Sequence, residues 1–176
     1  MYSCIAILPS VRINDDDDDD DDDDVVLSWT FDLLFQSSGI TSYASIDGSA
    51  IRSHLDAVTV ALWLRTSDRQ NQGTPLSYAT DERDNELAIT DCNGFVIYVA
   101  GSDEVTDVSV ADGTWHHIAV TWSSRDGLWN IYKDGLRQDG GRGLAAERFI
   151  RGFVLFIVVY SSFYHCNVHK SYKFKK

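Results

Sequence analysis

The sequence predicts an all-β fold, an antiparallel sandwich of short strands. Short segments rich in β-branched and aromatic residues recur along the chain, and Asp-Gly or Asn-Gly pairs separate several of them. No segment keeps the apolar period of an amphipathic helix, about 3.6 residues. Only 2 prolines occur among the 176 residues. Short strands separated by such turns are typical of β-sandwiches.

The clearest hairpin lies between Trp115 and Gly135. Trp115–Trp122 and Trp129–Lys133 have the composition of strands, and Asp126-Gly127 between them favours a tight turn. A second turn is expected at Asp134-Gly135, because glycine adopts positive φ without steric cost. This segment holds three of the chain's 5 tryptophans. Since buried indoles contribute large apolar areas, we expect the hairpin to form part of the core.

Further strands are expected before this hairpin, at Tyr43–Ile46, Val58–Leu64, Leu87–Thr90, Phe95–Val99 and Val105–Val110. The polar segment Ser67–Gly73 between two of them is expected to be a loop. In Val58–Leu64 the valines and leucines alternate with Thr59, Ala61 and Trp63, so both faces are largely apolar. That pattern suits an inner strand of a sheet.

Composition and charge allow one domain with a hydrophobic core. The formal net charge is −12, and the low-complexity run Asp15–Asp24 supplies ten of the negative charges, so the rest of the chain carries −2. Residues 1–30 are therefore expected to be a disordered segment, because ten adjacent like charges repel one another. The alternative for the run is a weak, nonspecific cation sink. The chain has no basic stripe, which argues against a nucleic-acid partner.

A resemblance to the pentraxin family rests on the segment His117–Ser124. The family signature has the pattern His-x-Cys-x-Ser/Thr-Trp-x-Ser/Thr, and every fixed position matches except the cysteine, which is Ala119 here. Further similar segments follow the family order: Phe31–Leu33, Tyr43–Ile46, Val58–Trp63, Gly73–Thr80, Asp84–Leu87 and Trp115–Gly135. The chain is similar to pentraxin modules of large extracellular mosaic proteins. The resemblance implies a two-sheet jelly roll of the concanavalin and laminin-G type, with a partial domain over residues 31–144.

In pentraxins a disulfide joins the cysteine of the signature to a cysteine on an earlier strand. The corresponding positions here are Ala119 and Ala61, so the resemblance implies that Val58–Leu64 and Trp115–Trp122 lie side by side with these two alanines close together. The cysteines that are present, Cys4, Cys92 and Cys166, are scattered and lack the spacing of metal ligands.

The resemblance also implies a calcium site. Asp84-Asn85 matches the first half of the site in the family, and carboxylate and amide oxygens suit calcium. The family's Glu-Gln-Asp segment, which supplies further ligands, has no match after Leu144, so the fold is expected to be incomplete at its C-terminus and calcium binding weak or absent. We expect Asp84 and Asn85 in an exposed loop; the alternative is an ordinary turn without a metal.

Residues 145–176 are expected to be a divergent tail that packs poorly. The apolar run Phe153–Tyr160 is too short for a membrane helix, which needs about 20 residues. It is either a sandwich strand or part of an unrelated sequence. At the other end, the apolar patch Cys4–Leu8 has no basic flank and makes a poor secretory signal, although the resemblance implies a secreted protein.

The functional hypothesis is an extracellular recognition module. The resemblance implies calcium-dependent binding of phosphorylated headgroups or glycans on cell surfaces or matrix, impaired here by the missing segment, and homo-oligomers as partners. The alternative is a metal-independent structural module or a non-functional fragment of a larger extracellular protein. His116-His117 does not suggest zinc, because neighbouring residues of a strand face opposite ways. The carboxylate pairs Glu82 with Glu86 and Asp103 with Glu104 do not suggest a glycosidase, so no enzymatic activity is expected.

Overall fold

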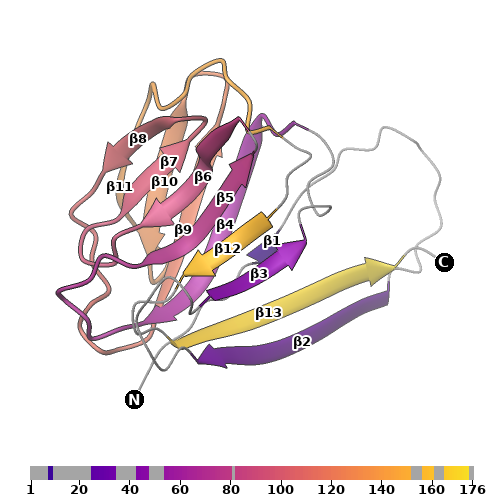
Figure 1. The fold of residues 1–176 in the computed structure, drawn as a ribbon, viewed down its shortest axis with the longest axis vertical. Coiled ribbons are helices and arrows are strands. Elements are labelled where there is room, and N and C mark those ends of the chain that lie inside the picture. Colours follow the sequence, from indigo (N-terminus) through magenta and orange to yellow (C-terminus); the bar gives the residue numbers. More distant parts are fainter. Residues whose placement is uncertain are drawn as a thin grey trace.

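The computed structural model is an antiparallel sandwich of two β-sheets (Figure 1). It describes residues 54–80 and 82–151 in full, and elsewhere only the backbone of five strands. The first sheet has the order β11-β10-β9-β4-β13-β2, with β1 also paired to β4, and the second has the order β3-β12-β5-β6-β7-β8. This architecture confirms the predicted fold class.

The strands of the first sheet are β1 (Leu8–Pro9), β2 (Val25–Leu34), β4 (Ala57–Arg65), β9 (His116–Ser123), β10 (Leu128–Lys133), β11 (Leu136–Gly141) and β13 (His165–Phe174). Those of the second are β3 (Tyr43–Asp47), β5 (Thr74–Thr80), β6 (Arg83–Thr90), β7 (Val96–Val99), β8 (Ser102–Val105) and β12 (Phe156–Tyr160).

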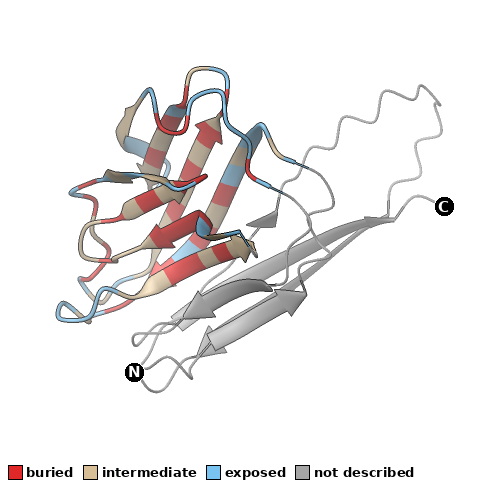
Figure 2. Ribbon diagram, turned by 45° about the horizontal axis from the view of Figure 1, so that its top comes forward, coloured by how far each residue is buried: buried red, intermediate tan, exposed pale blue. Residues whose placement is uncertain are grey.

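The core lies between the two sheets, where alternate residues of β4, β7, β9 and β10 are buried. Figure 2 shows this alternation as buried bands along the central strands. The inward side chains of the first sheet include Leu62, Leu64, Ile118, Trp122 and Ile131, and those of the second include Tyr78, Ile89, Ile97 and Val99. Each is at most 2% exposed. The hairpin β9–β10 is therefore core, as its composition predicted.

Strands β4 and β9 are direct neighbours, and Ala61 pairs with Ala119 in their register. This confirms the predicted placement of the two alanines. β4 is an inner strand, with β9 on one side and β13 on the other. Its second face is not core, however, because Trp63 is 45% exposed there and packs edge-on against His117.

The prediction of a strand over Val105–Val110 is wrong. β8 ends at Val105, and the following residues run past Phe95 without a regular ladder. The Thr106 hydroxyl donates to the Phe95 carbonyl and accepts from the Val108 amide. Such side-chain bonds to nearby backbone compete with the regular pairing of a sheet.

Both flanks of the chain contribute strands. β2 begins at Val25, before the expected start at Phe31, because apolar and β-branched residues follow directly after the acidic run. β12 pairs with β3 and β5, and β13 pairs with β2 and β4. These two strands pair through their backbones, whereas the expectation of a poorly packed tail concerns side chains outside the described residues and stays a prediction. The run Asp15–Asp24 lies outside the described residues. The described residues contain no helix with the length and apolar character needed to cross a membrane.

Candidate functional site

The predicted calcium ligands Asp84 and Asn85 lie in the first half of β6, not in a loop as expected. Tyr78 of β5 pairs with Leu87 and Thr80 pairs with Arg83, so Ala79 alone faces the residues between them. This mismatch is a β-bulge, which interrupts the inward and outward alternation of a strand. Consequently Asp84 and Asn85 are both exposed although they are adjacent in sequence.

The buried carboxylate of Glu86 holds the bulge in place through hydrogen bonds on its core side. The side chain of Glu86 is 0% exposed, and its two oxygens accept from Arg83 Nη1 at 2.9 Å and from the Arg151 amide at 2.6 Å. The Tyr78 hydroxyl donates to the Arg151 carbonyl at 2.5 Å. Burial, with a smaller contribution from the negative charge of Glu86, raises the pKa of Tyr78 to about 12.

A guanidinium group, that of Arg148, is linked to the backbone of Asn85 through one peptide unit. Arg148 Nη1 donates to the Ala100 carbonyl at 3.3 Å and to Ser102 Oγ at 3.2 Å. The same peptide unit that carries the Ala100 carbonyl donates its Gly101 amide to the Asn85 carbonyl at 3.2 Å. One peptide therefore separates Arg148 from the backbone of Asn85.

The donor set at the bulge fits part of a calcium site. Asp84 and Asn85 offer a carboxylate and an amide oxygen, and calcium takes six to eight oxygen ligands. Over residues 54–80 and 82–151, no group of three or more His, Cys, Asp or Glu side chains is arranged to hold a metal. Asp84 and Asn85 by themselves therefore offer only two of the oxygen ligands that such a site needs.

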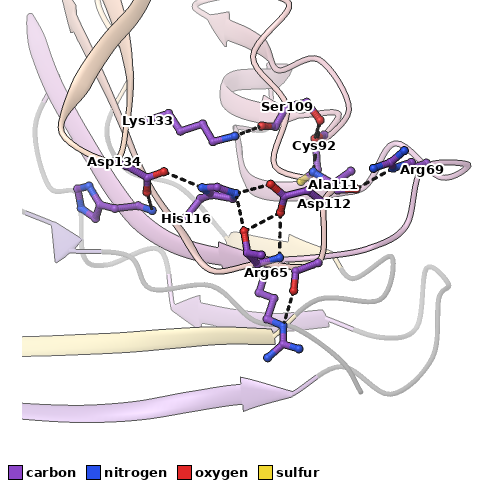
Figure 3. Close-up of polar contacts among 12 residues, drawn as sticks. Arg65, Arg69, Cys92, Ser109, Ala111, Asp112, His116, Lys133 and Asp134 are labelled. Carbon is purple, nitrogen blue, oxygen red and sulfur yellow. Dashed lines mark hydrogen bonds and ion pairs between the residues drawn. The ribbon is translucent and has the colours of Figure 1, made fainter.

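A second polar cluster, centred on His116, was not predicted from the sequence. The ring lies between two carboxylates, with Nδ1 2.7 Å from Asp134 and Nε2 3.0 Å from Asp112 (Figure 3). Asp134 also accepts the His117 amide at 2.8 Å, and Asp112 accepts the Thr114 amide at 2.9 Å. The His116 side chain is 12% exposed, so these bonds are partly shielded from water.

Three basic side chains hold the same segment through backbone carbonyls. Arg65 Nε donates to Gly113, Arg69 Nε to Ala111 and Lys133 Nζ to Ser109, at 2.9, 3.0 and 2.7 Å (Figure 3). The donors come from the end of β4, the loop after it and the end of β10. Residues 109–113 are therefore held from several sides.

Both carboxylates of the His116 cluster are held in their ionised form. Hydrogen bonds from the Thr114 amide and hydroxyl, and then from His116, move the pKa of Asp112 well below its usual range. For Asp134, burial alone would raise the pKa, but bonds from His116 and the His117 amide outweigh it and lower the pKa. The only sequence feature that pointed to this cluster is Asp112-Gly113-Thr114, which favours a turn closed by hydrogen bonds to the aspartate side chain.

The other candidate ligands and catalytic carboxylates all lie among the described residues. His116 and His117 have different surroundings, since His117 packs against Trp63 and His116 lies between Asp112 and Asp134. Glu82 is exposed and pairs with Arg151, whereas Glu86 is buried. Glu82 and Glu86 therefore do not face one substrate together.

Asp103 and Glu104 are consecutive residues of β8, where Asp103 is exposed and Glu104 is half-buried. Consecutive residues of a strand point to opposite faces. These two carboxylates therefore do not face one substrate either.

Comparison with protein families gives a match to the Pentaxin family over residues 32–151. The mouse protein "Sushi, von Willebrand factor type A, EGF and pentraxin domain-containing protein 1" is 48% identical over 124 residues, which cover 69% of this chain and 3% of that protein. Human neuronal pentraxin-2 is 41% identical over 93 residues, which cover 52% of this chain and 22% of that protein. The chain spans only a small part of either relative.

Solved structures show the same fold. The heptameric SAP-like pentraxin from Limulus polyphemus superposes with a TM-score of 0.58 at 19% identity, covering 73% of this chain and 62% of that one. Domains LG4-5 of the mouse laminin alpha1 chain superpose with a TM-score of 0.54 at 17% identity, covering 86% of this chain and 45% of that one.

Proposed function

Since this chain belongs to the pentraxin family, we propose that it is an extracellular recognition module that binds phosphorylated or carbohydrate ligands through a weakly held calcium ion. Asp84 and Asn85 would hold the ion, and the ion would present a positive charge to an anionic or hydroxyl-bearing ligand. The protein is secreted and its partners are cell-surface or matrix ligands, with a homo-oligomer as a further expectation. Catalysis forms no part of this function.

The observation that carries the proposal is the bulge in β6. In a regular strand one of two adjacent side chains would point into the core, whereas here Asp84 and Asn85 are both exposed. The buried Glu86, bonded to Arg83 and to the Arg151 amide, fixes the backbone at this point. Rigid placement of two oxygen donors favours binding of a cation to them.

Arg148 favours an anionic ligand over a neutral one. Its guanidinium is one peptide unit from the Asn85 backbone, and among the described residues it donates to a carbonyl and a hydroxyl, not to a carboxylate. Arginine pairs with phosphate through two parallel hydrogen bonds. A phosphate that contacts calcium at Asp84 and Asn85 would thus have a second positive group nearby.

Calcium titration by calorimetry tests the metal part of the proposal. We expect saturable binding with a Kd of about 1 mM or weaker, because two side-chain ligands leave most of the coordination to water. Asp84→Ala and Asn85→Ala should abolish it, and Asp107→Asn, which changes an exposed carboxylate in the segment after β8, should leave it unchanged. Absence of saturable binding to the wild type would overturn the calcium site, and micromolar binding would overturn the claim that it is weak.

Binding of phosphoethanolamine, measured with calcium and with chelator, tests the ligand part. We expect binding only with calcium, and an approximately tenfold loss in Arg148→Ala, which corresponds to about 1.4 kcal/mol. Binding that persists in chelator would favour the metal-independent module instead.

A further inference from the structure

Aspartate followed by glycine is a chemically reactive pair. The backbone nitrogen of the glycine can attack the aspartate side chain, because glycine has no Cβ to obstruct the approach. The pairs in residues 82–151 are Asp112-Gly113, Asp126-Gly127, Asp134-Gly135 and Asp139-Gly140. Since the four pairs have the same reacting groups, differences in their reactivity in the folded chain arise from their surroundings.

The surroundings of Asp112 hold both reacting groups apart. Its carboxylate accepts the amide and the hydroxyl of Thr114 at 2.9 and 2.7 Å, and it lies 3.0 Å from His116. The Gly113 amide donates to the Thr66 carbonyl at 2.8 Å. The nitrogen is therefore directed away from the side chain that it would attack.

Two further carboxylates are engaged by groups other than the next amide. Asp134 accepts the His117 amide at 2.8 Å and lies 2.7 Å from His116 Nδ1. Asp126 forms an ion pair with Arg142. Each of these side chains must break such contacts before it can react with the glycine that follows it.

The carboxylate of Asp139 has a different partner. Its Oδ1 accepts the amide of the next residue, Gly140, at 2.7 Å. Within residues 82–151, no other hydrogen bond or ion pair holds this side chain. The attacking nitrogen thus already lies beside the carboxyl group that contains its target, Cγ. Reacting groups that are held close together in this way react faster than groups that must first meet.

The backbone at Asp139 is also weakly restrained. β11 is the edge strand of the first sheet, next to β10 alone. The pairing with β10 skips Gln138, so a bulge directly precedes Asp139. Gly140 has φ +156°, a conformation that residues with a side chain rarely adopt. The small rotation that brings the nitrogen onto Cγ therefore disturbs few other bonds.

We propose that Asp139 is a site of spontaneous modification, which forms isoaspartate in the folded chain faster than the other three Asp-Gly pairs. The Gly140 nitrogen forms a bond to Cγ of the protonated carboxyl group. The hydrogen from this nitrogen and the hydroxyl group from Cγ leave together as water, and the product is a cyclic imide. Water then opens the imide at either carbonyl. Opening at the side-chain carbonyl restores aspartate, and opening at the main-chain carbonyl gives isoaspartate.

The modification changes the edge of the sheet. In isoaspartate the main chain runs through the side-chain carbons, so β11 gains one carbon atom between residues 139 and 140. Gly141 lies against the buried indole of Trp129, where an added Cβ would be 3.0 Å from Nε1. A longer β11 cannot keep both this contact and its register with β10.

The test compares the four pairs in the full 176-residue chain, aged in mildly acidic buffer either folded or unfolded in urea. Trypsin places the pairs in separate peptides, namely 84–125, 126–133, 134–137 and 138–142. Isoaspartate is measured in each by chromatography and by labelling with isoaspartyl methyltransferase. In the folded chain we expect it to form about tenfold faster at residue 139 than at the other three positions. In urea the four rates should be similar.

Two results of this comparison would overturn the proposal. One is a folded chain in which residue 139 reacts no faster than the other three. The other is a rate at residue 139 that is lower in the folded chain than in urea, because the fold would then hinder the reaction there.

Two variants test the assignment. Asp139→Glu moves the carboxyl group one carbon farther from the Gly140 nitrogen, so the product in peptide 138–142 should disappear. Arg142→Gln removes the partner of Asp126, so isoaspartate should form several-fold faster at residue 126 and at an unchanged rate at residue 139. A product that persists in Asp139→Glu, or an unchanged rate at residue 126 in Arg142→Gln, would overturn the proposal.

Discussion

A disulfide introduced between β4 and β9 tests the register of the central strands. Ala61 and Ala119 are directly opposite one another, and opposed residues of antiparallel strands have Cα atoms about 4.5–5.5 Å apart. Bonded cysteines have Cα atoms about 4.4–6.8 Å apart, so the double variant Ala61→Cys/Ala119→Cys should oxidise without backbone movement. Both alanines are only partly buried, so the added sulfur atoms have room.

The magnitude follows from the loop that the crosslink closes. The crosslink closes a loop of about 60 residues and so lowers the entropy of the unfolded chain by an amount worth about 4 kcal/mol. Disulfides in practice raise the free energy of unfolding by about 2–4 kcal/mol, which is the increase we expect. Urea unfolding of the double variant, once oxidised and once in reducing agent, measures the gain in the free energy of unfolding, and the reduced sample serves as the control. Peptide mapping should find a crosslink between residues 61 and 119, and no mixed bond to the buried Cys92.

The diagonal pair provides a matched control. Thr59 is opposite Thr121, so Thr59 and Ala119 are two positions out of register on the same face. Diagonal neighbours are about 7–8 Å apart, outside the range of an unstrained disulfide. The variant Thr59→Cys/Ala119→Cys should therefore gain less than about 1 kcal/mol on oxidation. Equal stabilisation of both double variants, or none in the 61–119 variant, would refute the register.

The remaining predictions concern packing and pH. Gly127→Ala should lower the free energy of unfolding by about 3 kcal/mol, because φ is +61° and a Cβ would lie 2.6 Å from backbone atoms. Gly135→Ala should lower it by only about 1 kcal/mol, because φ is +80° but the space around the added Cβ is open. Equal losses for the two variants in urea unfolding would contradict this prediction. Glu86→Ala should lose about 3 kcal/mol because it leaves buried donors without an acceptor, and Glu82→Ala, with a side chain 71% exposed, should lose less than about 0.5 kcal/mol. The pKa of Tyr78 is raised to about 12, so its contribution is fully present below the usual value of 10.0 and is lost as the pH rises through 12. Tyr78→Phe should weaken the fall in stability between pH 10 and 12, and an unchanged alkaline profile would contradict the assignment.

Local composition determined much of the fold. Alternation in Val58–Leu64 identified β4, and Asp126-Gly127 and Asp134-Gly135 marked the turns at which β9, β10 and β11 are joined. These features depend on neighbouring residues alone, since glycine at positive φ and alternating side chains act within a few positions. The family followed from an ordered set of such segments, and with it the pairing of Ala61 and Ala119.

Only the tertiary structure decided where the polar groups meet. The bulge that exposes Asp84 and Asn85 arises from the pairing of β5 with β6, and no property of the two residues themselves specifies it. The bonds of His116 to Asp112 and Asp134 likewise depend on the folding of the segment after β8 against the turn after β10. Hydrogen bonds of this kind need distances of about 3 Å between groups that are far apart in the sequence. Such distances are set by the packing of the strands and loops, which is why the sequence identified the expected ligands but neither the bulge that presents them nor the His116 cluster.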